Sequence, residues 1–438
     1  MTKPISGFSK LTKEEKINWV TENYTQNADQ SKKILQGYWN QNQRIQQLHD
    51  EFIENTITNF YIPQGIAPNF LINDTLYAIP MAIEESSVIA AASKTAKFWL
   101  KRGGFKAEIL GTEKVGQVHF IFKGDNKTLN SFFTYLKPLL FAESASLTTS
   151  MEKRGGGISD IILKDKTDKL KHYFQLHVTF QTKDAMGANF INSCLEQFAA
   201  TLKKEAASFN GFSKQEKDVE ILMSILSNYV PNCTVRAEVS CPVEDLKLSA
   251  KLTPEHTAEK IIQAIKIAQV EPYRAVTHNK GIMNGVDAVV LATGNDFRAV
   301  EAGVHAYACR NGRYSSLTSA EIENGIFKFW IELPLALGTV GGLTNLHPLV
   351  KLNLEILQRP STEELMQIIA VAGLAQNFAA VSSLVTTGIQ KGHMKMHLLN
   401  ILNQLCANET EKATLVEHFK TNPVTHHGVE IQLNMIRK

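Results

Sequence analysis

Between residues 112 and 222, apolar side chains alternate with polar ones in some segments and recur every three or four residues in others. Alternation predicts strands, and the longer period predicts amphipathic helices. The order strand, helix, strand, strand, helix, strand is that of a ferredoxin-like split βαβ unit. The segments are 117–122, 129–140, 158–163, 172–180, 189–204 and, for the returning strand, 234–240.

Capping residues predict where helices begin outside this unit. Thr12 and Glu15 form the pattern of a capping box, and Thr253 precedes a proline at the first helical position. One further helix is expected to begin after Ser86 or Ser87 and to end at Gly103 and Gly104. Another is expected to begin with Pro360, Ser361 and Glu364 in its first turn.

These patterns predict an α+β protein in which a small ferredoxin-like domain interrupts a larger mixed helical and β domain. We expect the large domain at residues 1–111 and 223–388, and the small domain at 112–222. A small helical flap is expected at 389–438, after a hinge rich in glycine.

The stretch Glu271–Glu301 combines an apolar centre with polar surroundings. Residues 286–292, VDAVVLA, have the composition of a strand that is buried on both faces, with Lys280 before it and Asp296 after it. Lys280 and Asp296 would then face each other across the strand. A surface salt bridge is the alternative interpretation of such a pair.

Composition excludes several classes of function. The chain has 438 residues, 44% apolar and 20% charged, with a formal charge of +3. This nearly neutral charge does not indicate binding to nucleic acid or to an anionic membrane. Its N-terminus lacks a signal-peptide core, and we expect no run that is apolar enough to span a bilayer. Five cysteines without a C-x-x-C pair predict small buried side chains, neither disulfides nor a zinc site. A cytoplasmic protein is expected.

Two further motifs have both a functional and a structural interpretation. Glu84 and Glu85 precede a helix, where carboxylates either complement the helix dipole or act as acids. Residues 184–189, DAMGAN, lie where a strand leads into a helix, so free amides there could receive a pyrophosphate or form an ordinary cap. No G-x-G-x-x-G accompanies them, so this is not a Rossmann fingerprint.

Several segments resemble those of class II 3-hydroxy-3-methylglutaryl-CoA reductases, the soluble enzymes of bacteria and archaea. The strongest matches are THNKGIMNG at 277–285 and ATGNDFRAVEAGVHAYACR at 292–310. The others follow in the family's order along nearly the whole chain: ENTITNF at 54–60, IEESSVIAAASKTAK at 83–97, KDAMGANFIN at 183–192, ILSN at 225–228, AGLAQNFAA at 372–380 and IQKGHM at 389–394.

The resemblance implies four catalytic side chains. Glu85 would be the catalytic acid, Lys280 would stabilise the oxyanion, and Asp296 would orient Lys280 and keep it charged. His393, on a closing flap, would protonate the departing CoA thiolate. The chain departs from the family pattern at Ser86, where the family usually has proline.

The resemblance also implies the ligand contacts. Residues Asp184, Met186, Gly187 and Asn189 would bind the dinucleotide. A neutral Thr148 beside Lys153 and Arg154 would tolerate a 2′-phosphate, so NADPH is favoured with NADH also usable, and no metal is required. A solvated surface is the alternative role for the two cations. Substrate contacts are expected from Ser87, Asn228, Arg274, Asn284 and Gln376.

The function so implied is the two-step reduction of 3-hydroxy-3-methylglutaryl-CoA to mevalonate and free CoA by a homodimer or a higher homo-oligomer. One alternative is the same enzyme working in the oxidative, mevalonate-degrading direction. Another is a CoA- or nucleotide-binding relative without catalysis, against which the presence of all four catalytic side chains argues. RNA binding is disfavoured because the predicted strands lack a basic and aromatic surface.

Overall fold

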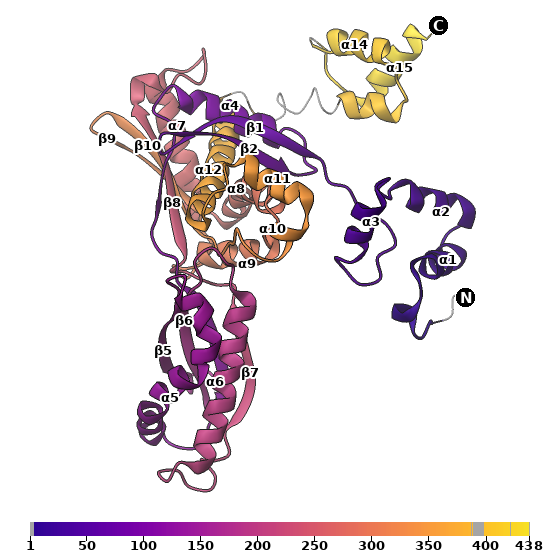
Figure 1. Ribbon diagram of the computed structural model, residues 1–438. Coiled ribbons are helices and arrows are strands. Elements are labelled where there is room, and N and C mark those ends of the chain that lie inside the picture. The colour runs from indigo at the N-terminus through magenta and orange to yellow at the C-terminus, as the bar shows by residue number, and fades with distance from the viewer. Residues whose placement is uncertain (1–3, 387, 389–397, 421, 438) are drawn as a thin grey trace. The chain divides into compact units, whose positions relative to one another are not determined.

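The computed structural model describes residues 4–386, 388, 398–420 and 422–437. It is 50% helical and 19% strand, which confirms the α+β class. The chain divides into two compact units, Met1–Pro63 and Gln64–Lys438. Figure 1 shows the elements of both.

The first unit is a small set of helices. The Thr12 hydroxyl oxygen accepts a hydrogen bond from the amide of Glu15, and the amide of Thr12 donates one to the Glu15 carboxylate, which confirms the predicted capping box. Lys13 Nζ lies 2.7 Å from Asp50 Oδ1 and 4.1 Å from the centre of the Trp39 ring, so one ammonium group joins the beginning and the end of the unit. The elements are η1 (Phe8–Lys10), α1 (Lys13–Tyr24), α2 (Ala28–Gly37) and α3 (Gln43–Asp50).

A four-stranded antiparallel sheet with strand order β5-β6-β4-β7 forms the lower part of the second unit in Figure 1. Two long helices, α5 and α6, cover one face, and Phe120, Phe174 and Phe180 fill the core between them and the sheet. This is the split βαβ topology. The bounds are β4 (Lys114–Ile121), α5 (Asn126–Glu152), β5 (Gly157–Asp165), β6 (Tyr173–Gln181), α6 (Ala188–Ser208) and β7 (Glu220–Ser227).

The predicted returning strand was wrong. Residues 234–240 lie in β8 of the other large sheet, and β7 completes the small sheet by pairing with β4. The reason is that β7 is an edge strand whose apolar residues Leu222, Met223 and Ile225 are exposed, so its pattern lacks a clear buried face. The regular alternation of β8 was the stronger signal, but it belongs to the neighbouring core.

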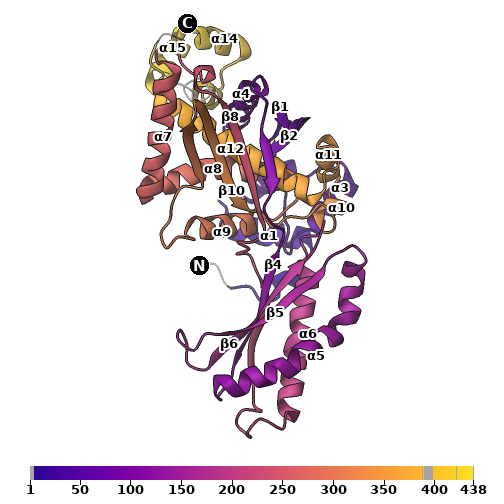
Figure 2. The ribbon, with the colours of Figure 1, turned by 90° about the vertical axis from the view of Figure 1, so that its left-hand side faces the viewer.

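The rest of the second unit contains a sheet of order β3-β8-β10-β9, a β1-β2 hairpin and the helices around them (Figure 2). Its strands are β1 (Gln64–Ile72), β2 (Thr75–Ala82), β3 (Lys106–Ile109), β8 (Thr234–Pro242), β9 (Thr318–Glu323) and β10 (Ile326–Pro334). Its helices are α4 (Val88–Leu100), η2 (Val243–Asp245), α7 (Pro254–Val270), α8 (Pro272–Ala292), α9 (Phe297–Ala308), α10 (Leu343–Leu346), α11 (Pro348–Ile356) and α12 (Thr362–Thr386).

Residues 286–292, predicted as a buried strand, form the last two turns of helix α8. A short buried apolar run does not distinguish a strand from a core helix, and here the helix continues back to Pro272. Gly285 permits α12 to approach, because a Cβ at this position would lie 2.5 Å from the carbonyl oxygen of Ala372. Gly285 therefore serves helix packing.

Helix α12 corrects the expectation that no segment is apolar enough to span a bilayer. Its most apolar window has a mean hydropathy of 1.8, which is sufficient by length and composition. However, 67% of that window is buried inside the protein, where α12 packs against α8 and α4. The predicted start is confirmed, because Ser361 and Glu364 exchange hydrogen bonds there.

The C-terminal residues form a separate small helical core. Residues 398–404 are helical, and α14 (Glu409–His418) and α15 (His426–Ile436) follow. Leu402, Leu415 and Val429 are buried among them. The carboxylate of Glu411 accepts two hydrogen bonds from the Arg437 guanidinium and one from the backbone amide of Asn408. Together with the charge of Arg437, these hydrogen bonds outweigh burial and lower the pKa of Glu411 to about 2.

Candidate active site

The side chains of Lys280 and Glu85 meet in one ion pair. Lys280 lies in the middle of α8 and Glu85 in the loop between β2 and α4, and Nζ lies 2.6 Å from Oε2. The side chains are 59% and 39% exposed. An exposed pair of this kind stabilises a fold by less than about 1 kcal/mol. The pair is therefore better explained by a role in a site that solvent and ligands can reach.

Ser87, next to that pair, has a strained backbone. Its φ is 76°, a left-handed conformation that costs a side-chain-bearing residue about 1 to 2 kcal/mol. Ser87 occupies the N-cap position of α4, but its hydroxyl group makes no capping hydrogen bond, so that part of the capping prediction was wrong. Strain that a cap does not explain, beside an exposed ion pair, is typical of a functional loop.

Asp296 lies beyond the C-terminal end of α8, at the N-cap of α9. It caps α9 by accepting hydrogen bonds from the amides of Arg298 and Ala299, and its carboxylate pairs with the Arg298 guanidinium at 3.0 Å. Burial raises the pKa of Asp296, but the hydrogen bonds and the charge of Arg298 outweigh it and lower the pKa overall. Lys280 pairs with Glu85, and no hydrogen bond or ion pair joins it to Asp296 among the described residues. The predicted contact across a strand is therefore absent within one chain, and the intervening residues 281–292 are helical.

Lys280, Asn284 and Asp287 follow one incompletely buried stripe of α8. Asp287 Oδ1 is buried without a hydrogen-bond partner in the described part of the chain. Burial, together with a hydrogen bond to Glu301 and its negative charge, raises the pKa of Asp287 to about 9. Asp287 therefore keeps its proton at neutral pH. The sequence showed Asp287 only as an interruption of an apolar run.

The raised pKa of Asp287 predicts that the free energy of unfolding depends on pH. Asp287 keeps its proton in the folded state up to about pH 9, whereas the unfolded chain releases it near the ordinary value of 3.8. The folded state binds more protons in that window, so stability falls as pH rises through it. Asp287→Asn should reduce the slope by up to about 1 kcal/mol per pH unit, which makes the variant the more stable protein at pH 8.

Urea unfolding at pH 6 and pH 8.5, at one protein concentration, measures this difference. Asp218→Asn is the matched control, because Asp218 is exposed and makes no ion pair with a described residue. Equal slopes for wild type and Asp287→Asn would show that Asp287 does not keep its proton in the folded state.

The residues before Lys280 face the core. His278 Nε2 lies 2.6 Å from Thr318 Oγ1, and burial, with the charge of Arg274, lowers the pKa of His278 to about 3. The side-chain amide of Asn279 donates a hydrogen bond to the carbonyl oxygen of Ser315 and accepts one from the amide of Leu317. These two polar side chains fix β9 against α8, so only Lys280 of the three consecutive residues reaches the surface.

The expected substrate contacts occupy different environments. Arg274 is half-buried near the beginning of α8, where burial lowers its pKa, and Asn284 lies one turn after Lys280. Gln376 in α12 is buried with its Oε1 atom unpartnered among the described residues, which leaves an acceptor available to a ligand. Asn228 is exposed just after β7, and its carbonyl group packs where Gly303 lacks a side chain.

The 184–189 turn joins β6 to α6 and is held by several hydrogen bonds. Asp184 Oδ1 accepts from the amide of Thr362, the first residue of α12. Gly187 has φ 89°, and a Cβ there would lie 2.4 Å from the Thr182 side chain, so glycine is required by the fold. Gly187 provides no side-chain cap for α6, so the amides after it, including that of Asn189, remain available to an anion.

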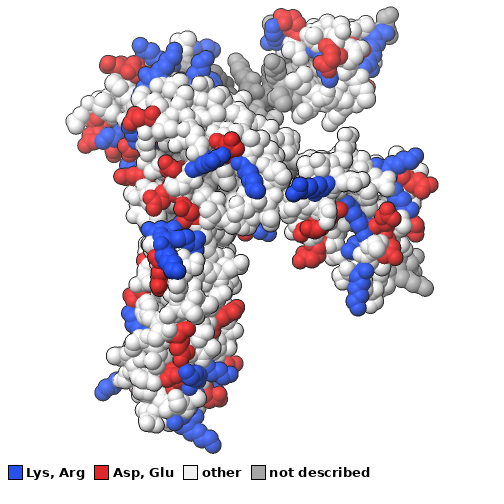
Figure 3. Space-filling model, in the orientation of Figure 1, with Lys and Arg blue, Asp and Glu red and all other residues white. Residues whose placement is uncertain are grey.

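Three cations surround the glycine turn after α5. Lys153 and Arg154 precede Gly155, and the side chain of Lys183 crosses it, because a Cβ at Gly155 would lie 3.4 Å from Lys183 Cε. None of the three makes an ion pair with a described residue. In Figure 3, basic side chains gather at this end of the small sheet. Thr148, in contrast, is 2% exposed and donates its hydroxyl proton to Ala145, so it does not face this surface.

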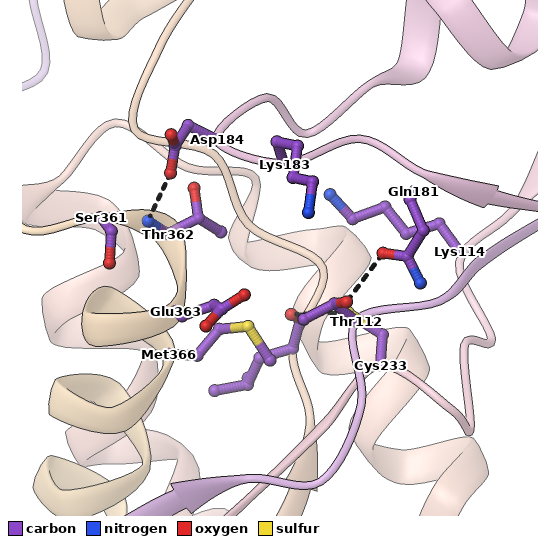
Figure 4. Close-up of a pocket in the computed structure, with 11 residues that line it drawn as sticks. Thr112, Lys114, Gln181, Lys183, Asp184, Cys233, Ser361, Thr362, Glu363 and Met366 are labelled. Carbon is purple, nitrogen blue, oxygen red and sulfur yellow. Dashed lines mark hydrogen bonds between the residues drawn. The ribbon is translucent and has the colours of Figure 1, made fainter. Parts of the chain in front are cut away.

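Sequence reasoning missed Lys183, which is 28 residues from Gly155 along the chain. Its φ of 51° places it in the left-handed region and turns its side chain toward the glycine turn. A cavity of about 270 Å³ adjoins it (Figure 4). The cavity is lined by Thr112, Lys114, Gln181, Lys183, Asp184, Cys233, Leu335, Ser361, Thr362, Glu363 and Met366.

The cysteines differ in burial. All five cysteines are free, and Cys194, Cys233 and Cys241 are buried as predicted, whereas Cys309 and Cys406 are exposed. His393 and most of the predicted hinge lie among residues 389–397, outside the described residues.

Comparisons with known proteins identify the family. The family model for hydroxymethylglutaryl-coenzyme A reductase matches residues 12–398. The 3-hydroxy-3-methylglutaryl-coenzyme A reductase of Archaeoglobus fulgidus is 37% identical over 420 residues, covering 95% of this chain and 91% of that protein. The chain belongs to the hydroxymethylglutaryl-coenzyme A reductase family.

Further relatives identify the class. A probable 3-hydroxy-3-methylglutaryl-coenzyme A reductase of Borreliella burgdorferi is 35% identical over 364 residues, covering 82% of this chain and 80% of that protein. A solved class II reductase of Streptococcus pneumoniae, bound to NADPH in open conformations, has 34% identity and a TM-score of 0.72, covering 94% of this chain and 99% of that chain. The predicted membership of class II is confirmed.

Proposed function

We propose that the protein reduces 3-hydroxy-3-methylglutaryl-CoA to mevalonate and CoA, with NADPH as the preferred hydride donor. Family membership supports the reaction, and the structural observation that carries the proposal is the 2.6 Å pair of Lys280 and Glu85. These side chains come from segments 195 residues apart in the sequence, yet the fold brings them together at an exposed position.

Each reduction step develops negative charge on the oxygen of the reacting carbonyl group. Lys280 supplies a fixed ammonium group to that oxygen, and such preorganised charge is often the largest contribution to catalysis. Glu85, hydrogen-bonded to the same ammonium group, is in position to return a proton when the alcohol forms. NADPH, when bound, supplies the hydride, and the protein's side chains orient the carbonyl group and stabilise its charge.

Asp296 requires a second copy of the chain in this proposal. Within one chain, Lys280 pairs with Glu85 and Asp296 pairs with Arg298, so the two do not meet. An isologous dimer with α8 near its axis would bring Asp296 of one copy to Lys280 of the other. The same surface would bury Glu85, which is 39% exposed in the single chain. His393, on the proposed flap at 389–438, would close over this shared site.

We place the dinucleotide between the 184–189 turn and the glycine turn at 155–157, within the small domain proposed at residues 112–222. Free amides after Gly187 would receive the pyrophosphate. Lys153, Arg154 and Lys183 would receive the 2′-phosphate, and this role replaces the one expected for the buried Thr148. The other substrate contacts remain those carried by Ser87, Asn228, Arg274, Asn284 and Gln376.

Reversing the charge of Lys183 tests the cofactor site. Lys183→Glu should raise KM for NADPH about 10- to 100-fold, the effect of losing a charge-assisted hydrogen bond, while KM for NADH changes little. Steady-state kinetics with both cofactors measures the ratio. Lys171→Glu is the control. Lys171 is exposed between β5 and β6, and its substitution changes the net charge by the same amount as Lys183→Glu. Equal effects on both cofactors would remove Lys183 from the phosphate site.

The function itself is tested by following the loss of reduced-nicotinamide absorbance with 3-hydroxy-3-methylglutaryl-CoA and each cofactor. We expect two equivalents of NADPH to be consumed for each CoA released, which a thiol reagent quantifies. Binding of NADPH and acyl-CoA without turnover would contradict the proposal and favour a non-catalytic relative.

A further inference from the structure

Lys114, the first residue of β4, is a buried lysine that neither the fold nor the proposed chemistry explains. Its side chain is buried, with the whole residue 5% exposed, and it contacts no carboxylate closely enough to form an ion pair among the described residues. Burial lowers the pKa of Lys114 to about 8, opposed by Cys233 and Asp184. At pH 7 the amine therefore keeps its proton, at an energetic cost that an apolar residue would not impose.

The ammonium group is surrounded by four oxygen acceptors. Nζ lies 2.6 Å from Thr182 Oγ1, 2.8 Å from the Ala185 carbonyl oxygen and 3.1 Å from that of Met186. The fourth acceptor is the carbonyl oxygen of Leu337, at 3.3 Å. The first three belong to the end of β6 and the 184–189 turn, and the fourth follows β10. One side chain thus joins two segments that are 150 residues apart.

The same two segments are fitted to each other by their backbones. Ala185 and Val340 form a parallel bridge, and the amide of Thr339 donates to the carbonyl group of Asp184 at 2.9 Å. A Cβ at Gly338 would lie 2.5 Å from the amide nitrogen of Met186, so only glycine permits this approach. Lys114 covers this junction from the cavity side, where its side chain points toward the 184–189 turn (Figure 4).

The junction leads on to the catalytic loop. The amide of Gly338 donates to Asn295 Oδ1 at 2.9 Å, and Asn295 immediately precedes Asp296. A displacement of the 184–189 turn would therefore act both on the proposed pyrophosphate site and on the loop that carries Asp296.

We propose that Lys114 is a positioning residue for dinucleotide binding: its ammonium group holds the 184–189 turn against residues 337–340. It touches neither the substrate nor the cofactor. This inference rests on the proposed function, because it assumes that the 184–189 turn receives the dinucleotide.

Lys114→Met tests the inference, since methionine fills the space without donating hydrogen bonds. We expect the dissociation constant of NADPH, measured by its fluorescence with the full-length protein, to rise about 10-fold, and kcat to fall up to about 100-fold. KM for the acyl-CoA substrate should stay within about twofold of wild type, because the turn does not contact that substrate in the proposal. Lys123→Met, at an exposed position just after β4, is the matched control and should match wild type.

A second variant leaves Lys114 intact and covers the case in which Lys114→Met does not fold. Gly338→Ala pushes the 184–189 turn away from the other side of the junction, and we expect the same weakening of NADPH binding with unchanged KM for the acyl-CoA substrate. Wild-type NADPH affinity in either folded variant, even with a lowered Tm, would reduce Lys114 to a structural role and overturn the inference. A wild-type protein without any reductase activity would instead overturn the proposed function.

Discussion

Lys280→Ala is expected to lower kcat for the reduction of 3-hydroxy-3-methylglutaryl-CoA about 100- to 1,000-fold, the effect of removing one preorganised oxyanion donor. The side chain is 59% exposed and its removal opens no core cavity, so the fold should be retained. Nicotinamide absorbance under saturating substrates measures kcat, and urea unfolding measures stability. The loss should appear in kcat, because the charge that Lys280 stabilises develops in the transition state.

The matched control is Lys266→Ala in α7. Lys266 is an exposed helical lysine without an ion pair to a described residue, so wild-type kinetics are expected. Glu85 loses its ion-pair partner in Lys280→Ala, which is why the Glu85→Gln variant should be measured alongside. Full activity in Lys280→Ala would end the assignment of the oxyanion role to this residue.

The second large effect concerns the origin of Asp296. Because Lys280 pairs with Glu85 and Asp296 with Arg298 within a chain, we expect Lys280→Ala and Asp296→Ala to be inactive alone and to complement each other when mixed. In a mixed dimer, one site contains both defects and the other contains the intact Lys280 of one copy with the intact Asp296 of its partner. Random pairing of equal amounts should restore about a quarter of wild-type activity.

The measurement requires unfolding and refolding the two variants together, or expressing them together with different tags. Lys280→Ala refolded with Lys280→Ala serves as the control for the procedure, and it should stay inactive. Failure to complement, in mixed dimers whose formation is verified by the tags, would show that each site takes both residues from one chain.

Local signals in the sequence were sufficient for much of the fold. The capping boxes at Thr12 and Ser361 begin helices where they were predicted, because caps satisfy amides that lie within three residues of the capping side chain. Within the small sheet, β4, β5, β6 and both helices were predicted from their periodicity. The returning strand was missed because its apolar residues are exposed at a sheet edge, where periodicity carries little information.

The candidate site was predictable residue by residue through resemblance, but its geometry was not. The sequence indicated that Lys280 and Glu85 matter, and the fold brings their charged atoms within 2.6 Å. It could not show that His278 and Asn279 turn into the core while Lys280 turns outward, because neighbours on a helix point in different directions around its axis. It also could not show that Lys183 crosses Gly155 or that Thr148 is buried.

The sequence by itself determined the α+β class, the first five elements of the small sheet and its helices, and the family to which the chain belongs. Only the tertiary structure decided that residues 286–292 are helical, that Asp296 pairs with Arg298 and not with Lys280 within one chain, and that Lys114 joins the 184–189 turn to residues 337–340. The physical reason is that caps and periodicity act over a few residues. The choice between a buried strand and a buried helix, and the acceptors of a buried ammonium group, depend on segments distant in the chain.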